Sequence, residues 1–284
     1  MRLLALLPAA YLASVLAWAQ IPKATIAYGC APEDLEMAGQ TCTATHPCAV
    51  YLELSSIEVV GGKLFLSGNL HTSDSTLMAI LLSSDDRGRT WSEPYKRIPG
   101  AGIEQIQFID YQNGWISGQT ILGRPRDAFV LITHDGGKTW TSRPVFEESR
   151  IGIVQQFWFE TKDTGSLLID RMQPTETGSR YELYESHTGG ESWTLLEVSA
   201  RQLKIKRSRA AEANPDWRLR ADAATKTYQL EQRQAEKWRA VTVFPIQVAE
   251  CKGVELQLAE PLPETEEPKP AAAPTPALKK RKKT

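Results

Sequence analysis

The eight residues Thr133-His134-Asp135-Gly136-Gly137-Lys138-Thr139-Trp140 decide the fold of this chain. In such a stretch the Asp135 carboxylate can accept hydrogen bonds from the backbone N–H groups of its own tight turn, and the glycines supply a backbone position with positive φ. The Trp140 ring then covers the hairpin with a large apolar surface. We therefore expect a structural element that closes a β-hairpin, and we call this eight-residue pattern the clip.

The clip occurs twice more along the chain. Ser84 to Trp91 matches the pattern Ser/Thr-x-Asp-x-Gly-x-Thr/Ser-Trp in full, and Ser186 to Trp193 matches it except that Thr188 replaces the aspartate. The three tryptophans are 49 and 53 residues apart, which is near the ~40 to 50 residues of a four-stranded propeller blade. The residues that we expect to hold the clips together are Ser84, Asp86, Gly88, Thr90 and Trp91; Thr133, Asp135, Gly137, Thr139 and Trp140; and Ser186, Gly190, Ser192 and Trp193.

Strand-like segments surround each clip. Residues 128–132 and 141–146 flank the second clip, and two more such segments, 103–109 and 115–121, precede that hairpin. A fourth, degraded unit ends near Trp238, and its expected strands are residues 203–207, 217–221, 227–232 and 238–243. The sequence thus predicts an all-β protein, a β-propeller-like array of about four, alternatively five, four-stranded blades with a disordered C-terminal tail.

The second unit also resembles a known family. Residues 107–118, which include Asn113-Gly114-Trp115, and the clip at 133–140 look like one blade of the Asp-box (BNR) propellers, especially photosystem II assembly and stability factors. The resemblance covers about residues 50 to 245 and implies an exported β-propeller, although sialidases and sortilin-like receptors share the clip. Full Asp-box propellers have six or seven blades, so either a small closed ring or an open array that forms a homodimer fits this shorter chain.

The N-terminus has the pattern of a signal peptide. Arg2 precedes an apolar run from Leu3 to Trp18, and small residues around Ala19 predict cleavage after that residue. An uncleaved membrane anchor is the alternative, although the run is shorter than the ~20 apolar residues of a spanning helix. We expect a periplasmic or secreted protein.

The expected domain order follows from these segments. Residues 1–19 form the signal peptide, 20–49 a cysteine-containing segment, 50–260 the propeller-like domain and 261–284 a tail rich in Pro, Glu, Ala and Lys. The tail carries six basic and three acidic residues, so it is either a solvating tail or a weak electrostatic contact to the cell envelope. The net charge of -1 indicates no affinity for nucleic acid.

The four cysteines are Cys30, Cys42, Cys48 and Cys251. In a chain that leaves the cytoplasm, disulfide bonds are the expectation. Three pairings exist, and we favour Cys30 with Cys42 and Cys48 with Cys251, because the second bond would join the first strand to the last. A metal site of Cys42, His46 and Cys48 is the alternative, and we expect no metal and no cofactor.

An enzyme of the sialidase type is the strongest catalytic alternative. The resemblance would then imply an arginine triad, a Tyr-Glu pair and an acidic acid/base. Arg97-Ile98-Pro99 repeats the arginine motif of sialidases, but it follows the first clip instead of preceding it. The available side chains, whose spacing selects no triad or pair, are the arginines at 124, 126, 150, 171 and 180 and the tyrosines at 51, 111, 181 and 184. We therefore expect no catalytic residues.

Binding is the remaining class of function. Five cations fall within nine residues, so that one face of a strand would be basic: Arg201, Lys204, Lys206, Arg207 and Arg209. That strand is either a solvated face or a site for an acidic partner. We predict a non-enzymatic exported binding or complex-assembly module with a protein partner in the cell envelope, and the alternative is a sialidase-like glycoside hydrolase.

Overall fold

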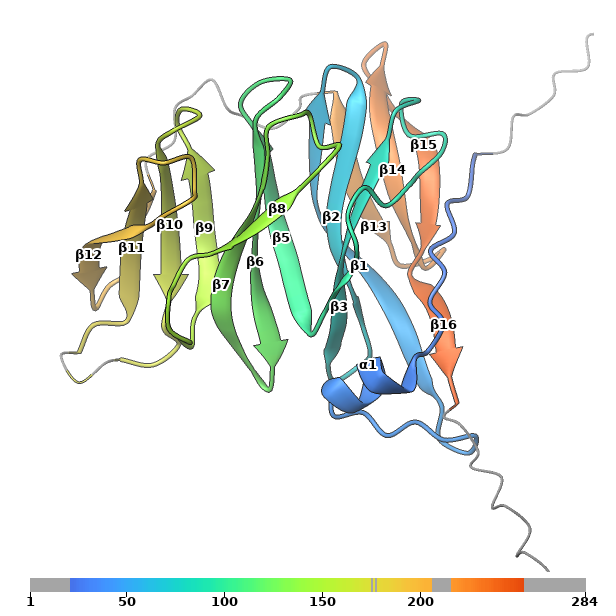
Figure 1. Cartoon of the computed structure of the whole chain (residues 1–284). Helices are drawn as coiled ribbons and strands as arrows, with labels where there is room; N and C mark the ends of the chain where they lie inside the picture. The colour runs from blue at the N-terminus through green and yellow to red at the C-terminus, as the bar shows by residue number, and fades with distance from the viewer. Residues whose placement is uncertain (1–20, 175, 177, 206–215, 253–284) are drawn as a thin grey trace, which may run out of the picture. The chain divides into compact units, whose positions relative to one another are not determined.

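The computed structural model describes residues 21–174, 176, 178–205 and 216–252. Apart from one short helix, α1 (Pro32–Met37), the regular elements in these residues are all β-strands (Figure 1). This confirms the all-β prediction. The expected signal peptide and tail lie outside the described residues, as do Lys206, Arg207 and Arg209 of the basic segment.

The described strands form four antiparallel sheets, one for each predicted unit, and this confirms the propeller-like array. Sheet 1 contains β1 (Cys48–Val60), β2 (Lys63–His71), β3 (Thr76–Ser84) and β4 (Ile98–Pro99), together with β16 (Gln247–Cys251) beside β1. Sheet 2 contains β5 (Ala101–Phe108), β6 (Gly114–Leu122), β7 (Arg124–Thr133) and β8 (Thr141–Pro144). Sheet 3 contains β9 (Ile153–Phe159), β10 (Gly165–Asp170), β11 (Tyr181–Ser186) and β12 (Thr194–Ser199), and sheet 4 contains β13 (Trp217–Asp222), β14 (Thr227–Gln234) and β15 (Lys237–Pro245).

Residues from both ends of the described chain complete sheets that lie far away in sequence. Strand β16 pairs with β1, so that Cys251 stands opposite Cys48. The N-terminal segment runs beside β15, where the Ala24 N–H donates to the Val243 carbonyl at 2.9 Å and the Val243 N–H donates to the Pro22 carbonyl at 3.0 Å. Sheets 1 and 4 therefore both depend on residues from the far end of the chain.

All four cysteines form disulfide bonds, but their pairing differs from the one we favoured. Cys30 is bonded to Cys251, and Cys42 is bonded to Cys48. Cys30 has a backbone φ of 54°, a left-handed conformation that is uncommon for a residue other than glycine. These bonds fit a protein of the periplasm or the extracellular space. In the described part of the chain, no helix is long and apolar enough to span a membrane.

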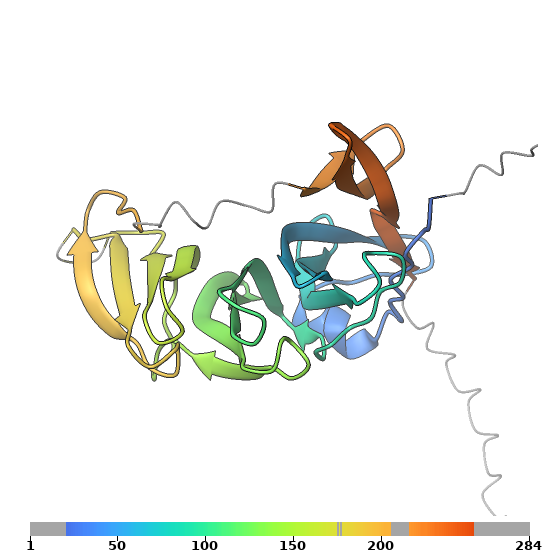
Figure 2. The same ribbon diagram turned by 90° about the horizontal axis from the view of Figure 1, so that it is seen from above.

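Aromatic side chains fill the space between neighbouring sheets. Ring pairs cross these junctions, among them Trp115 with Phe159 at 4.0 Å between centroids, Phe65 with Phe108 at 5.0 Å, and Trp91 with Phe244 at 5.2 Å. Sheet 2 thus packs on sheet 3 and on sheet 1, and sheet 1 packs on sheet 4. Figure 2, seen from above, accordingly shows sheet 1 between sheets 2 and 4.

Each clip forms the turn after the third strand of its sheet. In the second clip, the Asp135 carboxylate accepts hydrogen bonds from the backbone N–H groups of Lys138 and Thr139 at 3.0 and 2.9 Å, and from the Thr139 hydroxyl at 2.6 Å. Desolvation acts to raise the pKa of Asp135, but these hydrogen bonds and one from Thr133 outweigh it and hold the pKa at about 2. In the third clip, only the Thr188 hydroxyl is present to accept the Ser192 N–H, at 2.9 Å.

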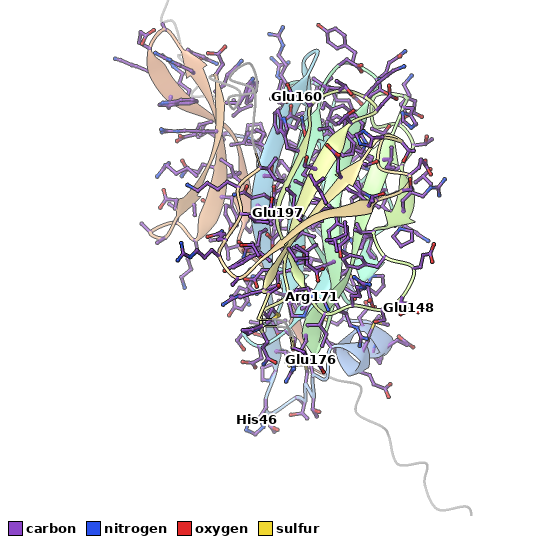
Figure 3. All side chains as sticks on the ribbon, turned by 90° about the vertical axis from the view of Figure 1, so that its left-hand side faces the viewer. His46, Glu148, Glu160, Arg171, Glu176 and Glu197 are labelled. Atoms are coloured by element: carbon purple, nitrogen blue, oxygen red, sulfur yellow. A yellow bond between two sulfur atoms is a disulfide. The ribbon has the colours of Figure 1, made fainter. Side chains whose placement is uncertain are left out.

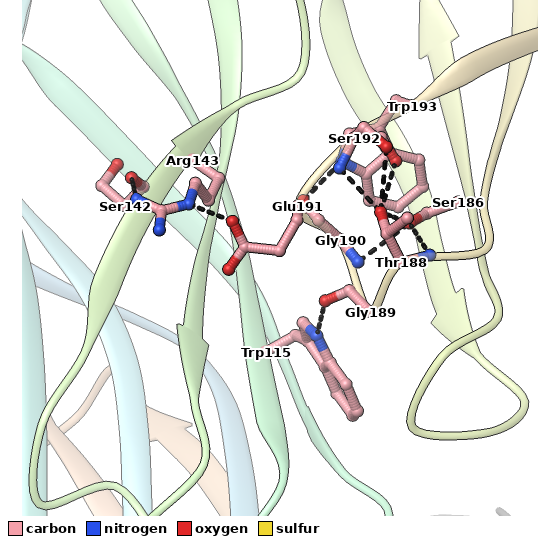
Figure 4. A network of polar contacts seen from close by, with 10 residues as sticks. All are labelled: Trp115, Ser142, Arg143, Ser186, Thr188, Gly189, Gly190, Glu191, Ser192 and Trp193. Atoms are coloured by element: carbon pink, nitrogen blue, oxygen red, sulfur yellow. Dashed lines mark hydrogen bonds and ion pairs between the residues drawn. The ribbon is translucent and has the colours of Figure 1, made fainter.

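The clips also join one sheet to the next. The indole N–H of the buried Trp115 in sheet 2 donates to the Gly189 carbonyl of the third clip at 2.8 Å, and Arg143 forms an ion pair with Glu191 of the same clip (Figure 4). At the other end of the array, Thr242 of sheet 4 donates to the Gly88 carbonyl of the first clip. The first and third clips therefore connect neighbouring sheets as well as forming turns.

Candidate functional site

Two glutamates occupy the first strands of neighbouring sheets. Glu53 of β1 stands opposite Asn69 of β2, and Glu104 lies in a bulge of β5, just after Ile103. The bulge is held against sheet 1, because the Ile103 N–H donates to the Asn69 side chain at 2.9 Å and the Ser67 hydroxyl donates to the Glu104 carbonyl at 3.1 Å. These cross-sheet hydrogen bonds bring Glu104 toward Glu53.

The two carboxylates influence each other electrostatically. Desolvation raises the pKa of Glu104, and the negative charge of Glu53 raises it further. Tyr228 of β14 has a raised pKa, chiefly because it is partly buried, and the Glu53 charge contributes to that shift. Glu53 therefore lies where side chains of sheets 1, 2 and 4 meet.

A third glutamate lies further along β1. Burial raises the pKa of Glu58 to about 7, although a hydrogen bond from the Phe108 N–H acts in the opposite direction. We call Glu53, Glu58 and Glu104 the carboxylate row. The sequence analysis did not select any of the three, because they belong to no motif.

Glutamine side chains extend this polar surface toward sheet 3. The Gln105 amide N–H of β5 donates to the Gln155 carbonyl of β9 at 3.3 Å, and the Gln202 amide N–H donates to the Gln155 side chain at 2.9 Å. Amide groups both donate and accept hydrogen bonds, so they suit a ligand rich in hydroxyl groups.

This arrangement permits general acid–base chemistry. When neighbouring carboxyl groups differ in their environment, one can stay protonated and donate a proton while the other stays ionised. Glu104 has the raised pKa that such a donor needs, and the charge of Glu53 contributes to it. No group of three or more His, Cys, Asp or Glu side chains in the described ranges could hold a metal ion.

Some of the arginines and tyrosines named for the sialidase alternative do not gather at a shared site. Arg97 forms an ion pair with Glu93 at 2.7 Å, and Arg126 forms one with Asp127 at 3.2 Å, so neither belongs to a shared cluster. Tyr111 is 75% exposed.

The remaining candidates include a Tyr-Glu pair that the sequence analysis missed. The Tyr184 hydroxyl donates to the Glu182 carboxylate at 2.7 Å, Arg150 donates to the Tyr184 oxygen at 3.1 Å, and Arg171 lies 3.8 Å from Glu182. The spacing Glu182-x-Tyr184 was a usable signal, because alternate residues of a strand share one face.

The described part of the basic segment, residues 201–205, differs from our prediction, and the rest of the predicted strand lies outside the described residues. Residues 201–205 contain no strand, and Arg201 and Lys204 are exposed. The segment instead bonds to side chains of β9, where the Ile205 N–H donates to Gln156 at 3.2 Å and Gln202 contacts Gln155. Within the described residues, side-chain acceptors of β9 thus take the place of a strand ladder at 203–205.

Comparison with solved structures finds propeller-type proteins. An alpha-L-arabinanase from Penicillium chrysogenum is 10% identical with a TM-score of 0.34, and the match covers 68% of this chain and 60% of the arabinanase. An alpha-L-arabinofuranosidase from Fusarium graminearum is 14% identical with a TM-score of 0.35, covering 65% of this chain and 56% of that one. YCF48 from Cyanidioschyzon merolae, a photosystem II assembly factor, is 12% identical with a TM-score of 0.29, covering 65% of this chain and 67% of YCF48.

The four sheets and the repeated clip define an Asp-box β-propeller protein. Within that class, the chain belongs to the Sortilin-Vps10 family, described as sortilin, neurotensin receptor 3, which matches residues 79–245. A comparison with curated proteins finds no match. The chain spans less than two thirds of the length of the arabinanase and of the arabinofuranosidase.

The prediction of a non-enzymatic binding or assembly module is corrected by these comparisons. The similar structures include several glycoside hydrolases, among them a xyloglucanase from Xanthomonas campestris and a family 117 enzyme from Zobellia galactanivorans. These enzymes are 10–15% identical to this chain, a likeness that shows the shared fold alone. The assembly module and the expectation of no enzymatic activity are not retained beside them.

Proposed function

We propose that this protein hydrolyses a glycosidic bond at the carboxylate row. The observation that carries the proposal is the electrostatic coupling of Glu104 in β5 to Glu53 in β1, which raises the pKa of Glu104 together with its desolvation. Glycoside hydrolysis requires such a pair of carboxyl groups, one protonated and one ionised, on either side of the scissile bond.

Each member of the pair has a distinct role. The protonated Glu104 donates its proton to the leaving glycosidic oxygen, which must gain a proton as the bond to the anomeric carbon breaks. The Glu53 carboxylate acts on the opposite side of the sugar as the base or the nucleophile. The amides of Gln105, Gln155 and Gln202 would hold sugar hydroxyl groups along the same surface.

Release of reducing ends from polysaccharides tests the proposal. The panel contains arabinan and xyloglucan, together with chromogenic glycosides of neutral sugars. We expect Glu104→Gln and Glu53→Gln each to lower kcat at least 100-fold, because a positioned acid or base contributes ~10² to 10⁴ in rate. Glu197→Gln, a change of the same kind on the exposed strand β12, should leave the rate unchanged.

The pH profile separates a catalytic role of Glu104 from a structural one. The wild-type rate should fall as pH rises through the raised pKa of Glu104, and this alkaline limb should disappear in Glu104→Gln. Thermal unfolding of each variant shows whether it is folded. Hydrolysis of no member of the panel, or full activity in folded Glu104→Gln, would exclude this site.

We also propose that the enzyme works outside the cytoplasm. The two disulfide bonds support an oxidising compartment, and the N-terminal pattern supports export with cleavage after Ala19. N-terminal sequencing of the protein purified from its native envelope or medium should then begin at Gln20. A mature chain that begins at Met1 would contradict cleavage after Ala19.

A further inference from the structure

A second candidate site lies away from the carboxylate row, where sheet 2 meets sheet 3. A pocket of about 470 Å³ is lined there by six residues: Arg124, Ile151, Arg171, Met172, Gln173 and Pro174. Strand β7 begins at Arg124, and the last four of these residues directly follow β10. Ile151 is held beside Arg124, because the adjacent Gly152 N–H donates to the Pro125 carbonyl at 3.0 Å.

The cations of this pocket are incompletely paired. One terminal nitrogen of Arg171, Nη1, is buried and has no hydrogen-bond partner among the described residues. Nη1 lies 3.8 Å from the Glu182 carboxylate, which is close enough for an ion pair but too far for a hydrogen bond. Glu182 instead accepts the Tyr184 hydroxyl at 2.7 Å. Arg124 is exposed and forms no ion pair within the described chain.

The Asp170 carboxylate at the end of β10 is also paired with another residue. Asp170 accepts two hydrogen bonds from Arg180, at 2.7 and 2.8 Å, and therefore does not neutralise Arg171 or Arg124. Its side chain also accepts the Met172 N–H at 2.7 Å. Figure 3, viewed from the side of sheet 3, labels Arg171 and Glu176, and Glu176 does not line the pocket.

The pocket wall is held in an unusual backbone conformation. Met172 has a φ of 65°, which is uncommon for a residue other than glycine. The contact with Asp170 fixes this turn, and the adjacent Arg171 N–H donates to the Arg180 carbonyl at 2.9 Å. Strained backbone of this kind is often retained at functional sites because it places a side chain that a relaxed turn would not place.

We propose that this pocket binds the carboxylate group of a small organic acid. Arg171 and Arg124 both line the pocket, and a carboxylate supplies planar acceptors that match a guanidinium group. Arg171 and Arg124 hold the carboxylate oxygens, and Ile151, Met172 and Pro174 cover the apolar part of the ligand. This site is independent of the carboxylate row and of glycoside hydrolysis.

Calorimetric titration of the full chain tests the proposal with two carboxylates and three control ligands. Glucuronate and benzoate are each compared with a neutral analogue, glucose and benzamide, and inorganic phosphate is titrated separately. We expect at least one of the two carboxylates to bind at least tenfold more tightly than its neutral analogue and more tightly than phosphate. Salt at about 0.5 M should weaken the binding.

Three variants locate the binding. Arg171→Gln and the exposed Arg124→Gln should each weaken the carboxylate at least tenfold. Arg233→Gln, which removes an arginine near the hairpin of β14 and β15, is the matched control and should bind as the wild type does. Binding of neither carboxylate, tighter binding of phosphate, or unchanged affinity in folded Arg124→Gln and Arg171→Gln would overturn the proposal. Glu104→Gln should bind normally, which keeps this result separate from the hydrolase test.

Discussion

Replacing Glu58 with glutamine should raise the free energy of unfolding at pH 8 and change it little at pH 4. Burial raises the pKa of this side chain from 4.5 to about 7 in the folded state. The stability that the protonated form contributes is therefore complete below about pH 4.5 and is lost as pH rises through 7. The full difference corresponds to about 3 kcal/mol, and because the side chain is only partly buried we expect a gain of about 2 kcal/mol in the variant.

Urea unfolding followed by tryptophan fluorescence measures this gain. Other groups titrate over the same range, so the quantity to compare is the difference between the variant and the wild type at each pH. Glutamine keeps an oxygen that can accept the Phe108 N–H, so the variant and the wild type can both form this hydrogen bond. Glu197→Gln on the exposed strand β12 is the control and should show no pH-dependent difference. An equal gain for Glu58→Gln at pH 5 and pH 8, or a loss at pH 8, would refute the reasoning.

Three further predictions concern the clips and the disulfide bonds. Thr188→Asp should stabilise the protein by about 1 kcal/mol, because a carboxylate accepts more hydrogen bonds than the hydroxyl; an unchanged urea midpoint would contradict this. Asp135→Asn should remove a stability contribution that is present above about pH 3.8 and lost as pH falls toward 2, as measured by acid unfolding against the wild type. Opening the Cys30–Cys251 disulfide, with a sequence separation of 221, should cost about 5 kcal/mol against about 2 for the other disulfide, with a separation of 6. Equal losses in the two serine double variants would argue against this entropic account.

The sheet hairpins could be predicted because the interactions of the clip are local. Asp86 reaches Thr90 four residues later, with a side-chain hydrogen bond of 2.7 Å, so the same residues that define the motif also close the turn. The strands around each clip then follow from alternation and from the repeat length. The fourth sheet was predicted less well, since the segment at 203–205 bonds to side chains of β9 and forms no ladder.

The disulfide pairing and the carboxylate row depend on residues that are distant in sequence. Cys48 stands opposite Cys251 across two strands, yet it is bonded to Cys42, because backbone pairing does not determine which thiols meet. Glu53 and Glu104 come from different sheets, and Glu104 lies in a bulge of β5. No spacing in the sequence contains this information, so the sequence analysis selected neither glutamate.

The pairing of β16 with β1 imposes an order on folding. Sheets 2 and 3 consist of consecutive strands, so each can form as soon as its own residues have been synthesised. Sheet 1 must wait for residues 247–251, and contacts of such long sequence separation slow folding. Cys42 and Cys48 can be oxidised early, whereas the bond to Cys251 closes only at the end. A chain truncated before Gln247 would leave one edge of β1 open, and an unpaired edge of this kind promotes association with other chains.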